Sequence, residues 1–126
     1  MLISFWKDPE IVMMAIRIIR LILREEKTYD ICTKIFPNTG DFLLMKMADA
    51  LTKEVLIELL ASLRNFVRRT EGVNLIPTSR IEMLYKVYEQ HADLRDTIDA
   101  ILLQLSANET HAKFIEKAGF SIDENE

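Results

Sequence analysis

Glycine and proline are scarce in this chain, with three of each among 126 residues. An all-β protein needs a turn about every 8 to 12 residues, and turns use these two residue types heavily. No segment alternates apolar and polar side chains for long enough to predict a strand. The chain is 49% apolar and 29% charged, which favours one folded all-α domain over a disordered or sheet-rich one.

Cysteine and positive charge are also in short supply. Cys32 is the only cysteine, which excludes an intramolecular disulfide and a cysteine-based zinc site, so we expect a reducing location, cytoplasmic or nuclear. The net charge of −4 disfavours a general nucleic-acid binder, because neutralising phosphates needs a surplus of Lys and Arg. The most apolar run, residues 11–23, is shorter than a membrane span and contains Arg17 and Arg20, so we expect a buried helix and no membrane contact.

Capping signals predict where the long helices begin. Asp8-Pro9-Glu10 combines an N-cap, a proline at the first helical position and an early acid, which predicts a helix that ends near Arg24. Thr52 and Asp93 are predicted to cap two further long helices. Ser79, with an acid at Glu82, has the spacing of a capping box and predicts another helix start.

Three apolar stripes at helical spacing indicate an internal repeat. They are Ile11, Ala15, Ile19 and Ile22; then Val55, Leu59, Leu63 and Phe66; then Leu94, Ile98, Leu102 and Leu105. The step from Ile11 to Val55 is somewhat longer than the step from Val55 to Leu94. A shorter connecting helix after the second stripe accounts for most of the difference. Units of roughly 40 to 47 residues are typical of helical repeats.

The third junction resembles the armadillo family most closely. Residues 103–109 (LQLSANE) and 113–119 (KFIEKAG) match the family's long-helix ending, its Asn-Glu turn, its short first helix and the Ala-Gly before its second helix. Asn65 occupies the family's asparagine position in the middle copy, and Gln104 stands there in the third. Leu21 departs from that pattern in the first copy.

The resemblance implies a right-handed α-solenoid. We expect an armadillo-like domain over residues 1–120, with about two full repeats and partial flanking repeats, followed by an acidic tail at 121–126. Residues 2–7 are expected to end a second helix of a preceding unit. Terminal repeats of a solenoid expose the faces that neighbours would cover, so self-association through the ends stays open.

The resemblance also implies a function, because the third helix of each armadillo unit lines a concave groove that holds extended peptides. Asparagines in that groove bind the peptide backbone. The family's tryptophan position falls on Arg17, Ala61 and Ala100, so the aromatic ladder that recognises basic import signals is missing here. We therefore expect a non-enzymatic protein-binding scaffold with different groove chemistry.

Arginines recur at the same turn of the first two copies. When Ile11 is aligned with Val55, Arg20 matches Arg64 and Arg24 matches Arg68. Guanidinium groups pair well with carboxylates and phosphates, so the pattern favours an acidic or phosphorylated peptide. The predicted partner-binding residues are Arg17, Arg20, Arg24, Ala61, Arg64, Asn65, Arg68 and Gln104. The alternatives are a solvated face whose arginine stems cover apolar surface, and nucleic-acid binding through the same arginines.

A second candidate surface follows the helices that precede the second and third stripes. Its members are Leu43, Met47, Met83 and Val87. Methionine-rich apolar strips can be adaptable binding surfaces, but they can also pack against a neighbouring helix.

No pattern of residues predicts catalysis or a cofactor. His91 and His111 are far apart and are expected at the surface or as caps. Asp96 and Asp99 lie about one helical turn apart, and we expect them on a solvated face. There is no glycine-rich phosphate loop and no metal-ligand spacing, so neither a cofactor nor a metal is expected, and an enzyme is not expected either.

Overall fold

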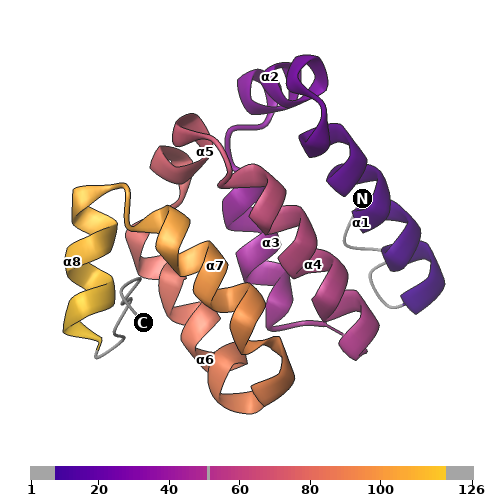
Figure 1. Ribbon diagram of the computed structural model, residues 1–126. Helices are drawn as coiled ribbons and strands as arrows, with labels where there is room; N and C mark the ends of the chain where they lie inside the picture. Colours follow the sequence, from indigo (N-terminus) through magenta and orange to yellow (C-terminus); the bar gives the residue numbers. More distant parts are fainter. Residues whose placement is uncertain (1–7, 51, 119–126) are drawn as a thin grey trace.

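The computed structural model describes residues 8–50 and 52–118, and within them the chain is all-helical, without a strand (Figure 1). The helices are α1 (Pro9–Arg24), α2 (Glu26–Ile35), α3 (Thr39–Met47), α4 (Lys53–Phe66), α5 (Thr70–Leu75), α6 (Glu82–Gln90), α7 (Arg95–Leu105) and α8 (Glu109–Lys117). Short 3₁₀ turns at Thr78–Ile81 and Ala92–Leu94 precede α6 and α7. The expectations for residues 2–7, for Gly119 and for the tail at 121–126 lie outside the described residues.

The predicted starts of α1 and α4 are confirmed. The Asp8 carboxylate accepts a hydrogen bond from the Glu10 backbone N–H at 3.0 Å, and the Thr52 hydroxyl accepts one from the Val55 N–H at 3.2 Å. Each bond satisfies a backbone donor that a helix start leaves without an intrahelical partner.

The capping roles predicted for Ser79 and Asp93 are wrong. Both residues lie in the 3₁₀ turns, and the helices that follow begin at Glu82 and Arg95 without a side-chain cap bond. The Asp93 carboxylate instead pairs with the Lys53 ammonium, at the start of α4. This ion pair links the start of α4 to the turn before α7, and the Asp93 carboxylate does not cap α7.

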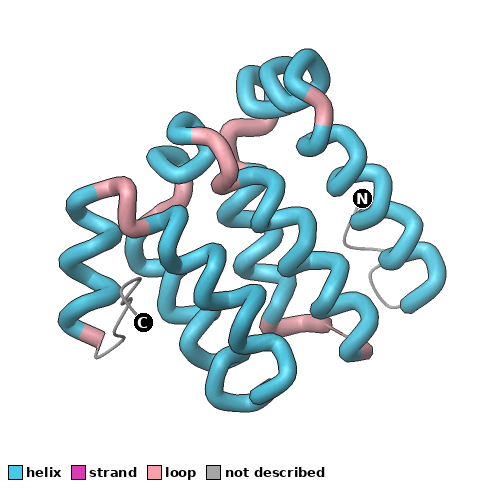
Figure 2. Tube along the Cα trace, in the orientation of Figure 1, coloured by secondary structure: helices cyan, strands magenta, loops and turns pink. Residues whose placement is uncertain are grey.

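Five of the described helices form two rows. α1, α4 and α7 lie side by side, with α4 in contact with both of the others. α3 packs against α4 and α6, and α6 also packs against α7, which makes the second row. A short helix follows each member of the first row, namely α2, α5 and α8 (Figure 2). Each of these three is shorter than the helix that it follows.

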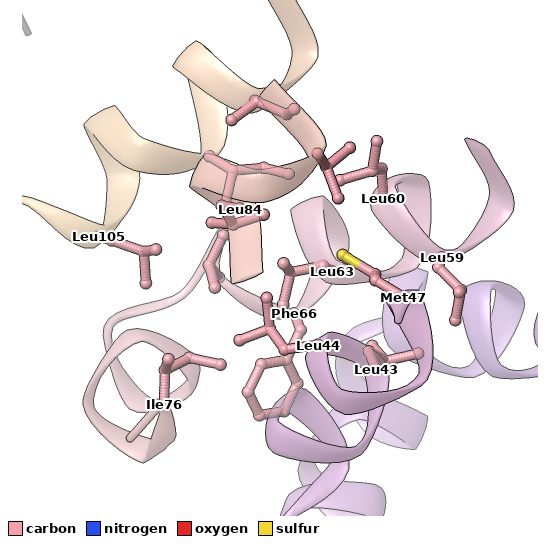
Figure 3. Close-up of a cluster of buried hydrophobic side chains, with 14 of the residues drawn as sticks. Leu43, Leu44, Met47, Leu59, Leu60, Leu63, Phe66, Ile76, Leu84 and Leu105 are labelled. Carbon is pink, nitrogen blue, oxygen red and sulfur yellow. The ribbon is translucent and has the colours of Figure 1, made fainter. Parts of the chain in front are cut away.

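The core runs continuously between the two rows (Figure 3). The second and third predicted stripes are confirmed, because Val55, Leu59, Leu63 and Phe66 are buried, as are Leu94, Ile98, Leu102 and Leu105. Apolar contacts of this kind are the largest favourable contribution to folding. No helix in the described ranges is both long enough and apolar enough to cross a membrane.

The first predicted stripe is out of register by one residue, although its member Ile19 does pack, partly buried, against the core. Ile11 is exposed, and the fully buried side chains of α1 are Val12, Ile16 and Leu23. Val55, the counterpart of Ile11 in the aligned stripes, lies on the buried side of α4. α1 has only one neighbour in its row within the described residues, α4, so its second apolar face stays open.

A buried tyrosine ties α2 to the end of α4. The Tyr29 hydroxyl donates a hydrogen bond to the Phe66 carbonyl, one of the acceptors that a helix end leaves unpaired. Gly72 lies against the same carbonyl, so closely that a Cβ there would overlap the oxygen. The Arg69 guanidinium lies 4.7 Å from the centre of the Tyr29 ring. This junction fixes the point at which α4 ends and the chain turns into α5.

Tyr29 predicts a loss of stability in alkali. Burial, chiefly, raises the pKa of Tyr29 from 10.0 to about 12. The folded state therefore favours the neutral phenol, so this stabilisation is complete below pH 10 and is lost as the pH rises through 12. In urea unfolding followed across this range, Tyr29→Phe should be about 1 kcal/mol less stable at neutral pH and should lose less stability in alkali than the wild type. Parallel curves for the two proteins would contradict the assignment.

Candidate functional site: a basic groove

The first row of helices encloses a groove of about 880 Å³. Seven of the eight predicted binding residues line it: Arg20, Arg24, Ala61, Arg64, Asn65, Arg68 and Gln104. Arg17 is not among the lining residues. Ala100, at the family's tryptophan position, also lines the groove. The remaining lining residues were not predicted from the sequence as binding residues: Ile57, Leu60, Leu94, Thr97 and Leu103.

The groove strip of α4 follows from helical geometry. Ile57, Ala61 and Arg64 recur at steps of four and three residues, which places them on one face. Arg68 lies in the turn after α4 and lines the same groove. The corresponding strip of α7 follows from aligning Val55 with Leu94, because Ala100 then matches Ala61 and Leu103 matches Arg64. The same alignment of the stripes could therefore have identified Leu103 from the sequence.

The groove is chemically asymmetric. Its α1 and α4 side contributes four arginines, whereas its α7 side contributes apolar and uncharged polar side chains such as Leu103, Thr97 and Gln104. No carboxylate is among the residues that line it in the described part of the chain. The site is thus positive on one side and neutral on the other, within a protein of net charge −4.

One carboxylate at the margin partly offsets the charge of two arginines. Glu58 Oε1 lies 3.2 Å from an Arg20 guanidinium nitrogen, and Glu58 Oε2 lies 3.6 Å from Arg17 Nε. The Glu58 side chain is only 12% exposed, so solvent screens these contacts less than it screens an open surface pair. Arg17 and Arg20 are therefore partly neutralised within the chain.

Three other arginines keep their charge available. Arg24, Arg64 and Arg68 are exposed, and no carboxylate in residues 8–50 and 52–118 forms an ion pair with them. Arg68 donates one hydrogen bond to the Arg24 carbonyl at 3.1 Å, at the end of α1. Its remaining donors, and those of the other two guanidinium groups, can bind an incoming anion.

The asparagine that the family resemblance singled out has a structural bond. Asn65 Nδ2 donates to the Arg20 carbonyl at 3.2 Å and so links α4 to α1. An amide oxygen is an acceptor with two lone pairs, so that of Asn65 can take a hydrogen bond from a ligand. Gln104, its counterpart on α7, lines the same groove and is exposed. The side-chain amides of Asn65 and Gln104 therefore line the same groove.

The second predicted surface is wrong as a docking site. Leu43, Met47 and Val87 are buried, and Met83 is half-buried against the core; Figure 3 shows Leu43 and Met47 within it. The reason is that α3 packs against α4 and α6, and α6 against α7, so these side chains belong to the core between the helices. The alternative interpretation, packing against a neighbouring helix, is the one observed.

His111 is also placed differently from the expectation. It is buried, with Nδ1 2.8 Å from the Thr78 hydroxyl and Nε2 3.0 Å from the Val73 carbonyl. The Asn108 side chain caps α8 by accepting from the His111 N–H at 3.1 Å. His111 therefore joins α8 to the preceding segment, and the expectation of a surface or capping residue is wrong for it.

The remaining titratable groups show no reactive cluster in the described part of the chain. Cys32 Sγ lies 3.5 Å from the Thr39 hydroxyl and packs against the core. Asp96 and Asp99 are exposed, as expected. Partial desolvation of the Asp99 carboxyl group and the nearby Asp96 charge raise the pKa of Asp99. Among the described residues, no group of three His, Cys, Asp or Glu side chains could hold a metal ion.

The geometry described so far defines an all-α protein with a basic groove along one row of helices. Comparisons of the chain with protein-family models, with curated proteins and with solved structures found no match. Its function is therefore inferred from the chemistry of the groove.

Removing the Glu58 carboxylate should strengthen anion binding. In Glu58→Gln, Arg17 and Arg20 lose their intramolecular counter-charge, so a phosphopeptide probe should bind about two- to fivefold more tightly, an effect that added salt reduces. Fluorescence anisotropy at two salt concentrations measures it. Glu89→Gln, an exposed change on α6, provides a matched loss of one negative charge away from the groove. Equal gains in both variants would show that only net charge matters.

Proposed function

We propose that this chain is a non-enzymatic, armadillo-like interaction domain whose groove binds an extended, acidic or phosphorylated segment of another protein. The observation that carries the proposal is the set of three guanidinium groups, of Arg24, Arg64 and Arg68, that line one groove without a carboxylate partner among the described residues. Unpaired guanidinium groups in a concave site favour anions with two or more oxygen atoms.

The repeat interpretation has support from burial and from element order. Aligned residues of α4 and α7 have the same environment: Val55 and Leu94 are buried, Phe66 and Leu105 are buried, and Asn65 and Gln104 line the groove. On the proposed layout, the two full units are α2-α3-α4 and α5-α6-α7. α1 would end a preceding unit and α8 would begin a following one, in a right-handed α-solenoid.

The asymmetry of the groove sets the chemistry of the proposed ligand. A phosphate or a pair of carboxylates would contact Arg64 and Arg68 by bidentate hydrogen bonds. An apolar side chain a few residues away would lie on Leu103 and Leu94, on the α7 side. The Asn65 amide oxygen would accept from a backbone N–H of the segment. The preferred segment is therefore anionic at one point and apolar at the next, rather than uniformly acidic.

Nucleic-acid binding is the alternative use of the same arginines. It is disfavoured by the net charge of −4 and by Glu58, whose carboxylate lies beside Arg17 and Arg20 at the groove margin. It also differs in its response to salt, because the logarithm of affinity for a nucleic acid falls steeply with the logarithm of salt concentration.

Replacing both Arg64 and Arg68 with Glu should abolish binding to the groove. Arg20 is left unchanged because a glutamate there would lie against Glu58 and confuse the result. The probe is a fluorescent peptide of about ten residues with one phosphoserine, flanking glutamates and a leucine. Loss of charge-assisted hydrogen bonds, worth about 1.5 to 3 kcal/mol each, should weaken its binding by more than about tenfold, with unchanged helical circular dichroism.

The control variant carries Lys86→Glu and Lys117→Glu, which change net charge equally at exposed positions on α6 and α8. It should bind the probe as the wild type does. Indistinguishable affinities for the two double variants would remove the groove assignment. Tighter, steeply salt-dependent binding of a DNA or RNA oligonucleotide than of the peptide would favour the alternative.

A further inference from the structure

α1 carries a second apolar face that nothing in the described chain covers. Ile11, Met14, Ile18 and Leu21 are 44%, 63%, 56% and 54% exposed. The opposite face of the helix packs against α4, and α1 forms the outer edge of its row (Figure 1). A helix that is apolar on opposite sides is ordinarily covered on both.

The spacing of this stripe is that of a coiled-coil seam. Its members recur at steps of three, four and three residues, which are the a and d positions of a heptad. Isoleucine occupies the a positions, and methionine and leucine occupy the d positions. Such a seam fits another helix that lies nearly parallel or antiparallel to it.

The stripe differs from the face by which the chain joins its own repeats. Besides the Glu58 ion pairs, α4 contacts α1 through two polar side chains: the Ser62 hydroxyl lies 3.4 Å from the Ile16 carbonyl, and Asn65 donates to the Arg20 carbonyl. When the buried residues Val12 and Val55 are aligned, the counterparts of Ser62 and Asn65 on α1 are Ile19 and Ile22, and neither has a side-chain donor. The α1 face is therefore not built for another repeat of the same kind.

We propose that a second copy of this chain covers the stripe, with the two α1 helices antiparallel. Charges on the helix select this occupant and this direction. When Ile11 lies opposite Leu21 of the second copy, and Met14 opposite its Ile18, Glu10 comes opposite the second copy's Arg24 along one edge of the seam. Symmetry makes this pair twice. Neither Glu10 nor Arg24 has an ion-pair partner among the described residues of its own chain.

The parallel arrangement lacks this complementarity. It would place Glu10 and Arg17 opposite Ala15 and Ile22 of the second copy, so no opposite charges meet. In the antiparallel pair the two Arg17 side chains approach each other at the centre, and Glu58 of each chain offsets part of that charge at 3.6 Å. Glu10 and Arg17 lie on the same edge of α1 as Arg24, which lines the groove, so the two grooves would open on the same side of the dimer.

Mass as a function of concentration tests the proposal. Size-exclusion chromatography with light scattering, from about 1 µM to about 1 mM, brackets the affinity expected for a small interface. The wild-type mass should rise from 14.7 kDa to twice that value. A mass that stays at 14.7 kDa throughout would overturn the proposal and leave the stripe to a different occupant.

Two sets of variants test the seam and its direction. Met14→Lys with Ile18→Lys should raise the dissociation constant on the order of 100-fold or more, whereas Met45→Lys, at an exposed apolar position on α3, should leave it unchanged. Glu10→Arg and Arg24→Glu alone should each weaken the dimer by about five- to tenfold, and the double swap should restore it. A dimer indifferent to the lysine substitutions, or a double swap that fails to restore it, would contradict the antiparallel pair.

The result is separable from the proposed function. Met14, Ile18 and Glu10 do not line the groove, and the groove test changes only Arg64 and Arg68. Arg24 does line the groove, so peptide binding is compared in the variant with Met14→Lys and Ile18→Lys, and the Arg24 variants are used for mass alone. Loss of the dimer with unchanged peptide binding, or the reverse, would show that the two properties rest on different surfaces. Absence of one property in the wild type would overturn its proposal and leave the other standing. Circular dichroism of each variant confirms that the helices are intact.

Discussion

Burial of α4 on all sides but one is the constraint on which the rest of the structure depends. α4 packs between α1 and α7 and against α3, so both of its flanks are covered. The strip through Ile57, Ala61 and Arg64 is what remains open above the core, and Arg68 continues it in the turn after α4. The charge of this strip is therefore the charge that α4 contributes to the groove, because the other faces of α4 are packed against neighbouring helices.

This constraint explains how an acidic protein acquires a basic site. The arginines of α1 and α4 meet across one helix contact, and Glu58 offsets only those nearest to it. The matching strip of α7 carries no arginine, so the positive potential is confined to one side. A locally positive hollow on a negative surface attracts anionic segments while the rest of the molecule repels them.

The sequence predicted those parts of the fold that depend on local chemistry. The Asp8 and Thr52 caps and the stripes of α4 and α7 are correct because capping bonds and helical spacing act within a few residues. The first stripe failed because α1 is apolar on two faces, and periodicity cannot tell which face a neighbour covers. His111 and Met47 were misplaced for the same reason: their burial depends on which helices come together, α8 with the turn before α6, and α3 with α6. Aligning the second and third stripes did bring groove residues together, such as Asn65 and Gln104, because equal positions in stacked helices face the same way.

The most direct test of a shared groove is a nuclear magnetic resonance titration of isotope-labelled protein with the phosphoserine peptide. The largest backbone amide shifts should fall on all three helices of one row, at residues such as Arg24, Arg64 and Gln104, and α3 and α6 should change little. Shifts confined to a single helix, or centred on α3 and α6, would contradict a binding surface formed by α1, α4 and α7 together.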